Sequence, residues 1–182
     1  MSTASNLEFA LLGLLRQKPQ SGYDLRKTFA STAMRHYSDS PGSIYPALRR
    51  LQSRGWITAD AKPTAGRGRQ VFHPSPGGEA ALVAWLSQPV TRDDVVWRLP
   101  ELMLRFAFMD GNVPRSIAVG FLDQFERALS SYVGELRSDF ERTSSLVPLN
   151  TGLLAFQCGV ESMESQLRWA RHARLQLLET AK

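Results

Sequence analysis

The chain has 182 residues and is 43% hydrophobic, which excludes a wholly disordered protein and allows one domain of usual size or two small ones. Its formal charge is +5, and the basic excess lies in residues 1–80, where eleven Lys and Arg oppose five Asp and Glu, a local charge of +6. That asymmetry indicates a polyanionic partner for the first part of the chain, either a nucleic acid or an anionic membrane surface.

The first expected helix begins at a capping box. Ser5 and Glu8 have the S-x-x-E spacing of that motif, and apolar residues follow at helical spacing until Lys18. The apolar stretch of residues 7–15 is too short to span a bilayer, and no Lys or Arg precedes it, so neither a membrane helix nor a secretory signal is expected. This pattern predicts a soluble, cytoplasmic protein without a membrane partner.

Two further helices are expected before residue 55. Ser21 can cap the second, and Asp24 suits the positive end of that helix. The third is expected to begin with Ser43 as its cap, because an earlier start would place Pro46 in the helix interior at a cost of about 3 kcal/mol. Gly55 then supplies the left-handed residue that ends the third helix.

The third helix is amphipathic. At 100° per residue its apolar face comprises Ile44, Ala47, Leu48 and Leu51. Its opposite face centres on Pro46, Arg49, Arg50 and Ser53. For an isolated helix, an ordinary solvated surface is the more common explanation of such a basic face. Its meaning therefore depends on the segments that follow.

Those segments predict a β-hairpin and a fourth helix. Residues 56–59 have the composition of a short strand, residues 62–68 are rich in turn formers, and residues 69–73 form a returning strand. Ser75 and Pro76 then have the types expected at the cap and first position of a helix that reaches Leu86. Three helices, a hairpin and a helix are the order of a winged helix-turn-helix domain.

The chain beyond Pro89 is expected to be almost wholly helical. The expected elements are a buried helix over residues 102–109, a helix of about 40 Å from residue 114 to residue 140, a loop at 144–148, and a last long helix over 153–177. Cys158, the only cysteine, excludes an intrachain disulfide, and its apolar surroundings predict a small buried hydrophobe. The two long helices carry more apolar stripe than one small domain buries, which favours pairing with a second copy.

The basic residues of the first part suit double-stranded DNA. A helix fits the major groove, where an arginine can bind O6 and N7 of guanine together, and Arg49 and Arg50 are placed for this. The hairpin arginines are flanked by glycine and suit a narrow minor groove, although Arg-Gly-Arg alone is more often an ordinary basic turn. The remaining expected DNA contacts are Ser43, Tyr45 and Ser53 on the helix and Lys62, Arg67 and Arg69 on the hairpin.

Three segments resemble the PadR family of bacterial transcriptional regulators. They are S-G-Y-D-L at residues 21–25, G-S-I-Y-P-A-L-R-R-L-Q-S-R-G-W-I at 42–57 and G-R-G-R-Q-V-F at 66–72. The resemblance implies a mainly α fold with an N-terminal winged helix-turn-helix and an all-α C-terminal dimerisation domain with long helices. It implies a nucleoid-associated homodimer that binds a pseudo-palindromic operator, usually as a repressor. The expected domains are residues 1–88 and 89–182.

The resemblance also assigns residues. It carries over Tyr45, Arg49 and Arg50 as contacts of the recognition helix, and Arg67 and Arg69 as contacts of the wing. Weaker candidates for DNA backbone contact are Tyr23 and Lys27, of which Tyr23 is as readily a core residue.

Two differences from the family pattern concern the exit of the wing. Pro74-Ser75 stands where the family generally has Leu-Thr, and Val71 stands where it has an aromatic residue. Both changes are mild, so they affect the expected exit angle of the wing rather than its existence.

Some family members release DNA when they bind phenolic acids or hydrophobic drugs, so a small hydrophobic effector is a further expectation. Trp97, Phe106 and Trp169 are apolar enough to line its pocket, although aromatic residues at helical spacing are more often core. No enzyme motif occurs, and no cofactor or metal is expected. The alternative function is a winged-helix protein-interaction module without sequence-specific DNA binding.

Overall fold

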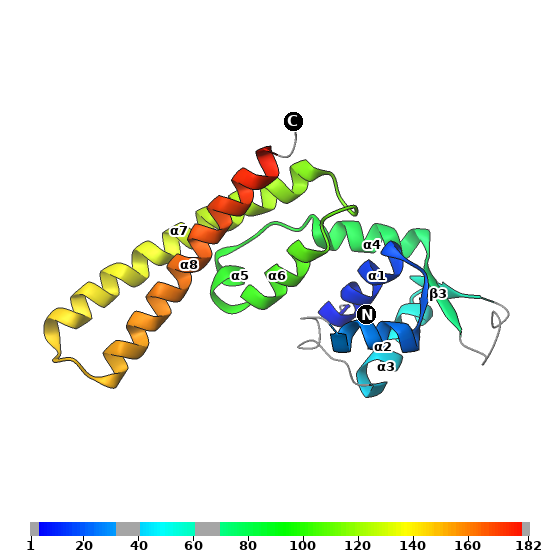
Figure 1. The fold of residues 1–182 in the computed structure, drawn as a ribbon, viewed down its shortest axis with the longest axis horizontal. Helices are drawn as coiled ribbons and strands as arrows, with labels where there is room; N and C mark the ends of the chain where they lie inside the picture. Colours follow the sequence, from blue (N-terminus) through cyan, green and yellow to red (C-terminus); the bar gives the residue numbers. More distant parts are fainter. Residues whose placement is uncertain (1–3, 32–40, 61–69, 180–182) are drawn as a thin grey trace. The chain divides into compact units, whose positions relative to one another are not determined.

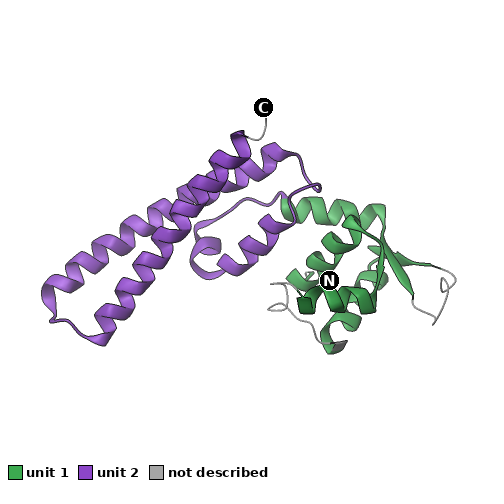
Figure 2. Ribbon diagram, viewed as in Figure 1, with its two compact units in different colours: residues 1–86 green, residues 87–182 purple. Residues whose placement is uncertain are grey.

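The computed structural model describes residues 4–31, 41–60 and 70–179. The chain divides into two compact units, Met1–Leu86 and Ser87–Lys182, coloured separately in Figure 2. The described elements are mostly helices, and the first unit adds a three-stranded antiparallel sheet with the order β1-β3-β2 (Figure 1). The expected mainly α fold is confirmed.

The first helix, α1, spans Asn6–Gln17 and begins as the sequence predicts. The Ser5 hydroxyl accepts from the backbone N–H of Glu8, and the Glu8 carboxylate accepts from the backbone N–H of Ser5, which completes the capping box. The helix ends at Lys18, before Pro19. Phe9 stacks on Trp85 of α4 with ring centroids 4.8 Å apart, so α1 packs at the centre of the first unit.

A strand that the sequence analysis missed precedes the second helix. β1 is only Gln20–Ser21, and it pairs with β3 so that Ser21 lies opposite Val71. Two residues are too few for an alternating pattern, so this strand carries no periodic signal. α2 follows over Gly22–Ser31, and the Ser21 hydroxyl caps it by accepting from the backbone N–H of Asp24.

The expected start of the third helix is wrong. α3 spans Pro41–Ser53, so Pro46 lies inside the helix instead of in its first turn. Proline lacks the amide that would bond to the carbonyl of Gly42, so the helix loses one backbone bond near its start. The apolar face is buried as predicted, and Gly55 ends the helix with a φ of 70°, in the left-handed region.

The sheet is completed by β2 over Ile57–Ala59 and β3 over Val71–Pro74, which pair antiparallel with Thr58 opposite His73. α4 follows over Pro76–Leu86, and the Ser75 hydroxyl accepts from the backbone N–H of Gly78, as expected of its cap. The largest fully buried side chains of this unit are Leu11, Leu12, Leu15, Leu25, Phe29, Ile44, Leu48, Leu51, Leu82 and Leu86.

The second unit contains two short helices and a long helical hairpin. The short helices are α5 over Arg92–Trp97, capped by Thr91, and α6 over Leu99–Ala107. The long ones are α7 over Arg115–Leu146 and α8 over Thr151–Glu179, which run side by side (Figure 1). α7 continues to Leu146, into the segment expected to be a loop, and the hydroxyls of Thr143, Ser144 and Ser145 donate there to carbonyls one turn earlier.

The expected burial of Cys158 is wrong, because its side chain is exposed. The buried residues of α8 are Val160, Leu167 and Ala170. Cys158 precedes Val160 by two residues, which places it about 200° away around the helix. No helix within the described residues is long and apolar enough to cross a membrane.

Candidate nucleic-acid interface

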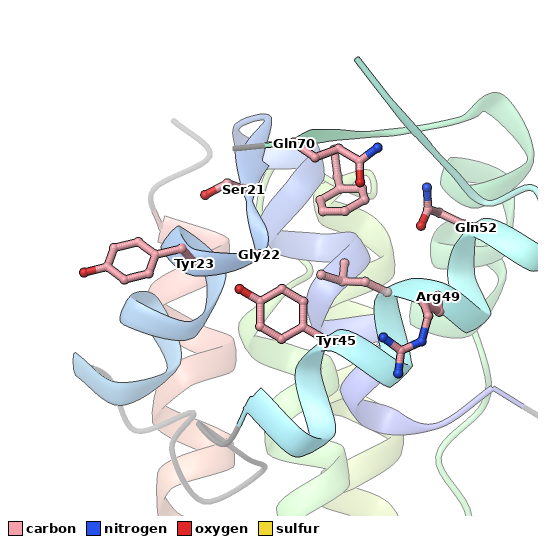
Figure 3. A pocket seen from close by; sticks show the side chains of 9 residues that line it. Ser21, Gly22, Tyr23, Tyr45, Arg49, Gln52 and Gln70 are labelled. Atoms are coloured by element: carbon pink, nitrogen blue, oxygen red, sulfur yellow. The ribbon is translucent and has the colours of Figure 1, made fainter. Parts of the chain in front are cut away.

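The outer side of α3 borders a groove in the first unit. Side chains of α3 meet the start of α2 and the end of the wing there, and the groove has a volume of about 360 Å³ (Figure 3). Its lining residues are Ser21, Gly22, Tyr23, Tyr45, Leu48, Arg49, Gln52, Gln70 and Phe72. Figure 3 shows Tyr45, Arg49 and Gln52 on α3, with Gln70 on the strand side.

Gly22 shapes one end of this groove. A Cβ atom on Gly22 would lie 2.7 Å from Cε1 of Tyr45, closer than real Cβ contacts, and 3.2 Å from Cδ1 of Leu48, which is a tight contact. The tyrosine ring therefore packs directly on the backbone at the start of α2. The Tyr45 side chain remains 40% exposed, so its hydroxyl can reach a partner outside the protein.

The short strand β1 closes the other side. Because Gln20 pairs with Phe72 and Ser21 with Val71, the sheet brings Phe72, and Gln70 two residues before it, beside the start of α2. The orientation of the Ser21 side chain is fixed by α2, since its hydroxyl donates to the Asp24 carboxylate at 2.6 Å. The groove thus combines residues that lie up to 51 positions apart in the chain, from Ser21 to Phe72.

The two adjacent arginines of α3 diverge. Arg49 lines the groove, whereas Nε of Arg50 donates to Glu8 of α1 at 2.9 Å. Consecutive helical residues point about 100° apart, so one of the pair faces the groove and the other faces α1. From the sequence, both arginines are expected to contact bases. They differ in the structure because Arg50 pairs with the buried carboxylate of Glu8.

The other predicted residues of helices α2 and α3 lie on the surface or close to it. Ser53 donates its hydroxyl to the carbonyl of Arg50, and Ser43 is half-buried. Tyr23 is 42% exposed, which settles the open choice against a core position, and the Arg26 guanidinium carbon lies 5.6 Å from its ring centroid. Lys27 is exposed on α2.

The predicted wing residues Lys62, Arg67 and Arg69 lie outside the described residues. The strands on either side of that segment are paired, and Asp60 donates its backbone N–H to the carbonyl of Val71. His73 Nε2 lies 2.8 Å from Asp60 Oδ1 across the same pair of strands.

Among the groove residues that sequence reasoning missed are two glutamines, and it also missed one supporting residue. Gln52 is three positions after Arg49, on the same side of α3, so the helical period contained a usable signal. Gln70 depends on strand pairing, which the sequence does not reveal. Glu8 looks like an ordinary capping residue until α1 packs against α3.

Of the three predicted effector residues, two lie together in the second unit and the third does not. Phe106 and Trp169 are in edge-to-face contact, with ring centroids 5.7 Å apart, whereas Trp97 is 79% exposed and makes none of the ring contacts within the described residues. A cavity of about 590 Å³ does exist in this unit. Its lining residues are Phe106, Ala107, Met109, Asp110, Val113, Arg115, Ala118 and Leu177.

Arg105 is an unusual buried cation in the same unit. It is only 5% exposed, and its Nε has no hydrogen-bond partner among the residues that the structure describes. Burial lowers the pKa of its guanidinium, which the nearby charge of Asp94 offsets in part. The guanidinium carbon lies 4.9 Å from the ring centroid of Phe121. Within the described ranges, no group of three or more His, Cys, Asp or Glu residues is placed to hold a metal ion.

Comparison with known proteins finds similar sequences for the first unit. Residues 11–84 match the transcriptional regulator PadR-like family. Transcriptional regulator Rv3488 of Mycobacterium tuberculosis is 43% identical over 46 residues, which are 25% of this chain and 43% of that protein. The negative transcriptional regulator PadR of Bacillus subtilis is 26% identical over 137 residues, or 75% of this chain and 74% of that protein. The match to Rv3488 therefore spans less than half of that relative.

Solved structures of similar proteins include Bacillus subtilis PadR in complex with operator DNA. It is 22% identical, with 94% of this chain and 98% of that chain covered and a TM-score of 0.42. The same protein in complex with p-coumaric acid gives 22% identity, 95% and 99% coverage and a TM-score of 0.42.

Proposed function

The chain carries a PadR-like regulator domain in residues 11–84, and from this premise we propose that the protein is a sequence-specific DNA-binding transcriptional regulator. It binds a pseudo-palindromic operator as a homodimer and represses transcription by occupying that site. The observation that carries the proposal is the groove beside α3, where an exposed flank bearing Tyr45, Arg49 and Gln52 lies in the basic part of the chain.

The residue types in the groove suit direct readout of bases. An arginine can bind guanine through O6 and N7, and a glutamine can bind adenine through N6 and N7. Arg49 and Gln52 supply these two groups from one flank of α3, and Gln70 adds a second amide. Within this proposal, Arg49 is the principal base contact.

The surrounding predicted residues take phosphate or minor-groove roles. The wing arginines Arg67 and Arg69 enter the minor groove, and basic residues such as Lys62 and Lys27 neutralise phosphates. Hydroxyl groups of the interface donate to phosphate oxygens as well. These are Tyr23, Ser43 and Tyr45. Ser53 donates its one hydroxyl hydrogen to the carbonyl of Arg50, so it must exchange that bond to contact a phosphate.

Homodimerisation is proposed through the helical second unit. Large apolar side chains remain exposed on α8 in the single chain, and a second copy would bury them. They are Leu154, Trp169, Leu175 and Leu178. In a simple dimer the two recognition helices then reach half-sites about 34 Å apart.

A small hydrophobic or phenolic effector is proposed for the cavity beside Phe106. Its volume of about 590 Å³ lies within the usual range of roughly 300–1,000 Å³ for ligand sites. A relative has been solved with p-coumaric acid, which motivates that compound as the first probe. Binding of it should raise the melting temperature of the wild type and have less effect on Phe106→Ala.

The function is tested by selecting bound sequences from random duplexes. The proposal predicts enrichment of a palindromic motif with half-sites about one helical turn apart. Affinity for bulk duplex should also fall steeply with salt, because bound phosphates release counterions. If no duplex is retained even at low ionic strength, the protein-interaction alternative replaces this proposal.

A further inference from the structure

A buried carboxylate lies behind α3. The side chain of Glu8 in α1 is 2% exposed, and both of its oxygens are engaged. Oε2 accepts from the backbone N–H of Ser5 at 2.7 Å, and Oε1 accepts from Nε of Arg50 at 2.9 Å. Burying a carboxylate is strongly unfavourable unless it is paired, so the charge of Arg50 compensates the buried Glu8. The same contact fixes the orientation of the Arg50 side chain.

The contact with Glu8 uses one of the five N–H donors of the guanidinium. The other four belong to the two terminal Nη groups. Among the described residues, Glu8 is the one partner of the Arg50 side chain, which stays 51% exposed. The terminal fork of Arg50 is therefore accessible while its stem is fixed in one direction.

The terminal fork of Arg50 points to a different side of α3 from the groove that Arg49 lines. Arg49 lines the groove with Tyr45 and Gln52, and Arg50 projects about 100° around α3 from Arg49. A helix in the major groove lies between two phosphate backbones, so a flank turned away from the bases meets phosphate. A planar fork of N–H donors matches two phosphate oxygens.

We infer that Glu8 is a positioning residue for operator binding. By holding Nε of Arg50, it presents the terminal amino groups of Arg50 to a DNA phosphate and leaves base contact to Arg49. Phosphate contacts of this kind fix the register of a protein on the duplex. Glu8 itself touches no DNA, and the inference rests on the proposed DNA-binding function.

The test is a double-mutant cycle with Glu8→Gln and Arg50→Ala. Glutamine also fits a capping box, so the start of α1 is retained, while the charge that holds Arg50 is lost. Glu79→Gln is the matched control, because it removes one negative charge from an exposed position in the same unit. Each variant is measured against the duplex selected by the wild type and against random duplex, well below its melting temperature.

The inference predicts a loss of affinity shared by the selected and the random duplex, because every duplex offers the phosphate that Arg50 contacts. Glu8→Gln should lower both affinities by about fivefold, leave the ratio between them unchanged, and have no further effect in the Arg50→Ala background. Arg50→Ala should lower both affinities and reduce the salt slope by about one. Glu79→Gln should leave both affinities unchanged. Arg50→Lys keeps the charge without the fork, so it should reproduce the loss of Glu8→Gln even if that variant folds poorly.

Two outcomes would overturn the inference while leaving the proposed function intact. In one, Glu8→Gln lowers the melting temperature but keeps the wild-type affinity for both duplexes, and Arg50→Lys does the same. In the other, the loss caused by Glu8→Gln persists in full without Arg50. A wild type that selects no sequence overturns both the function and the inference.

Discussion

At the scale of single residues, Arg49 and Arg50 differ in the surroundings of their side chains. Arg49 borders the groove beside α3, and Arg50 is tied to a buried carboxylate on α1. Arg49→Ala is expected to cost about 1–3 kcal/mol of binding free energy and to relax sequence preference at one position of each half-site. Competition titrations with single-base variants of the selected duplex measure both effects.

Arg49→Lys is the control for charge in this experiment. It keeps the positive charge but lacks the planar fork, so it should retain affinity for random duplex and lose discrimination at that base position. Equal losses on every sequence for both variants would show that Arg49 contacts phosphate instead of a base.

Arg105 gives a stability prediction at the same scale. Its guanidinium is buried, and its terminal nitrogens are 3.5 Å from the carbonyl of Pro89, at the limit of hydrogen bonding. Arg105→Met keeps the packing on Phe121 and removes the buried charge, so it should raise the free energy of unfolding by on the order of 1 kcal/mol.

Arg127→Met on the same unit is the exposed control, since the side chain of Arg127 is 68% exposed, and chemical denaturation should show little change for it. A marked destabilisation by Arg105→Met alone would mean that Arg105 has an anionic partner in solution.

At the scale of elements, the junction of β2 and α4 depends on a glycine. A Cβ on Gly78 would lie 2.0 Å from the backbone oxygen of Trp56, which cannot move without disturbing the wing. Gly78→Ala should therefore destabilise the first unit by about 2 kcal/mol or more.

The preceding residue supplies a matched control in the same turn of α4. A Cβ on Gly77 would meet the Ser75 hydroxyl at 3.7 Å, an ordinary contact. Gly77→Ala should be neutral or stabilising by up to about 1 kcal/mol, because alanine is the better helix former. Thermal denaturation of both variants decides the point, and equal midpoints would contradict the packing described.

The pairing of α7 with α8 is expected to depend on pH. Arg137 donates to Glu164 across the two helices and holds the pKa of that carboxyl below its usual value of 4.5. A lowered pKa in the folded state stabilises the fold above that usual value and loses its effect as the pH falls through the folded-state pKa.

Unfolding of the wild type and Glu164→Gln should consequently differ above pH 4.5 and converge at lower pH. Glu161→Gln, three residues earlier on α8, controls for the loss of one exposed carboxylate. A constant difference between wild type and Glu164→Gln across the whole pH range would assign the effect to packing instead of charge.

The same scale shows what the sequence could predict. The caps at Ser5 and Ser75 and the terminator at Gly55 were predicted correctly, because each is a local hydrogen bond or a local backbone preference. β1 was missed because a two-residue strand exists only through its pairing with β3. The start of α3 was misplaced because the local cost of Pro46 to helix stability was considered alone. In a folded protein most of the stability of a helix comes from tertiary packing of its apolar face, which offsets such a cost.

At the scale of the whole molecule, residues that act together come from distant parts of the chain. The α3 flank was predictable from helical period, but its division between Arg49 and Arg50 required the position of Glu8. The burial of Cys158 was mispredicted because apolar composition around a residue does not show which side of a helix meets its neighbour. Local sequence signals therefore predicted most of the helices and strands. Which side chains come together at the site depends on tertiary packing, which those signals do not show.

The proposed function requires that the flank of α3 bearing Arg49 reads guanine in the major groove. Protection of guanine N7 from methylation, on the duplex selected by the wild type, is the measurement that tests this contact. We expect a protected guanine in each of two half-sites about one helical turn apart, with that protection lost in Arg49→Ala while the rest of the footprint remains. Identical protection by wild type and Arg49→Ala, or binding without any protected guanine, would contradict it.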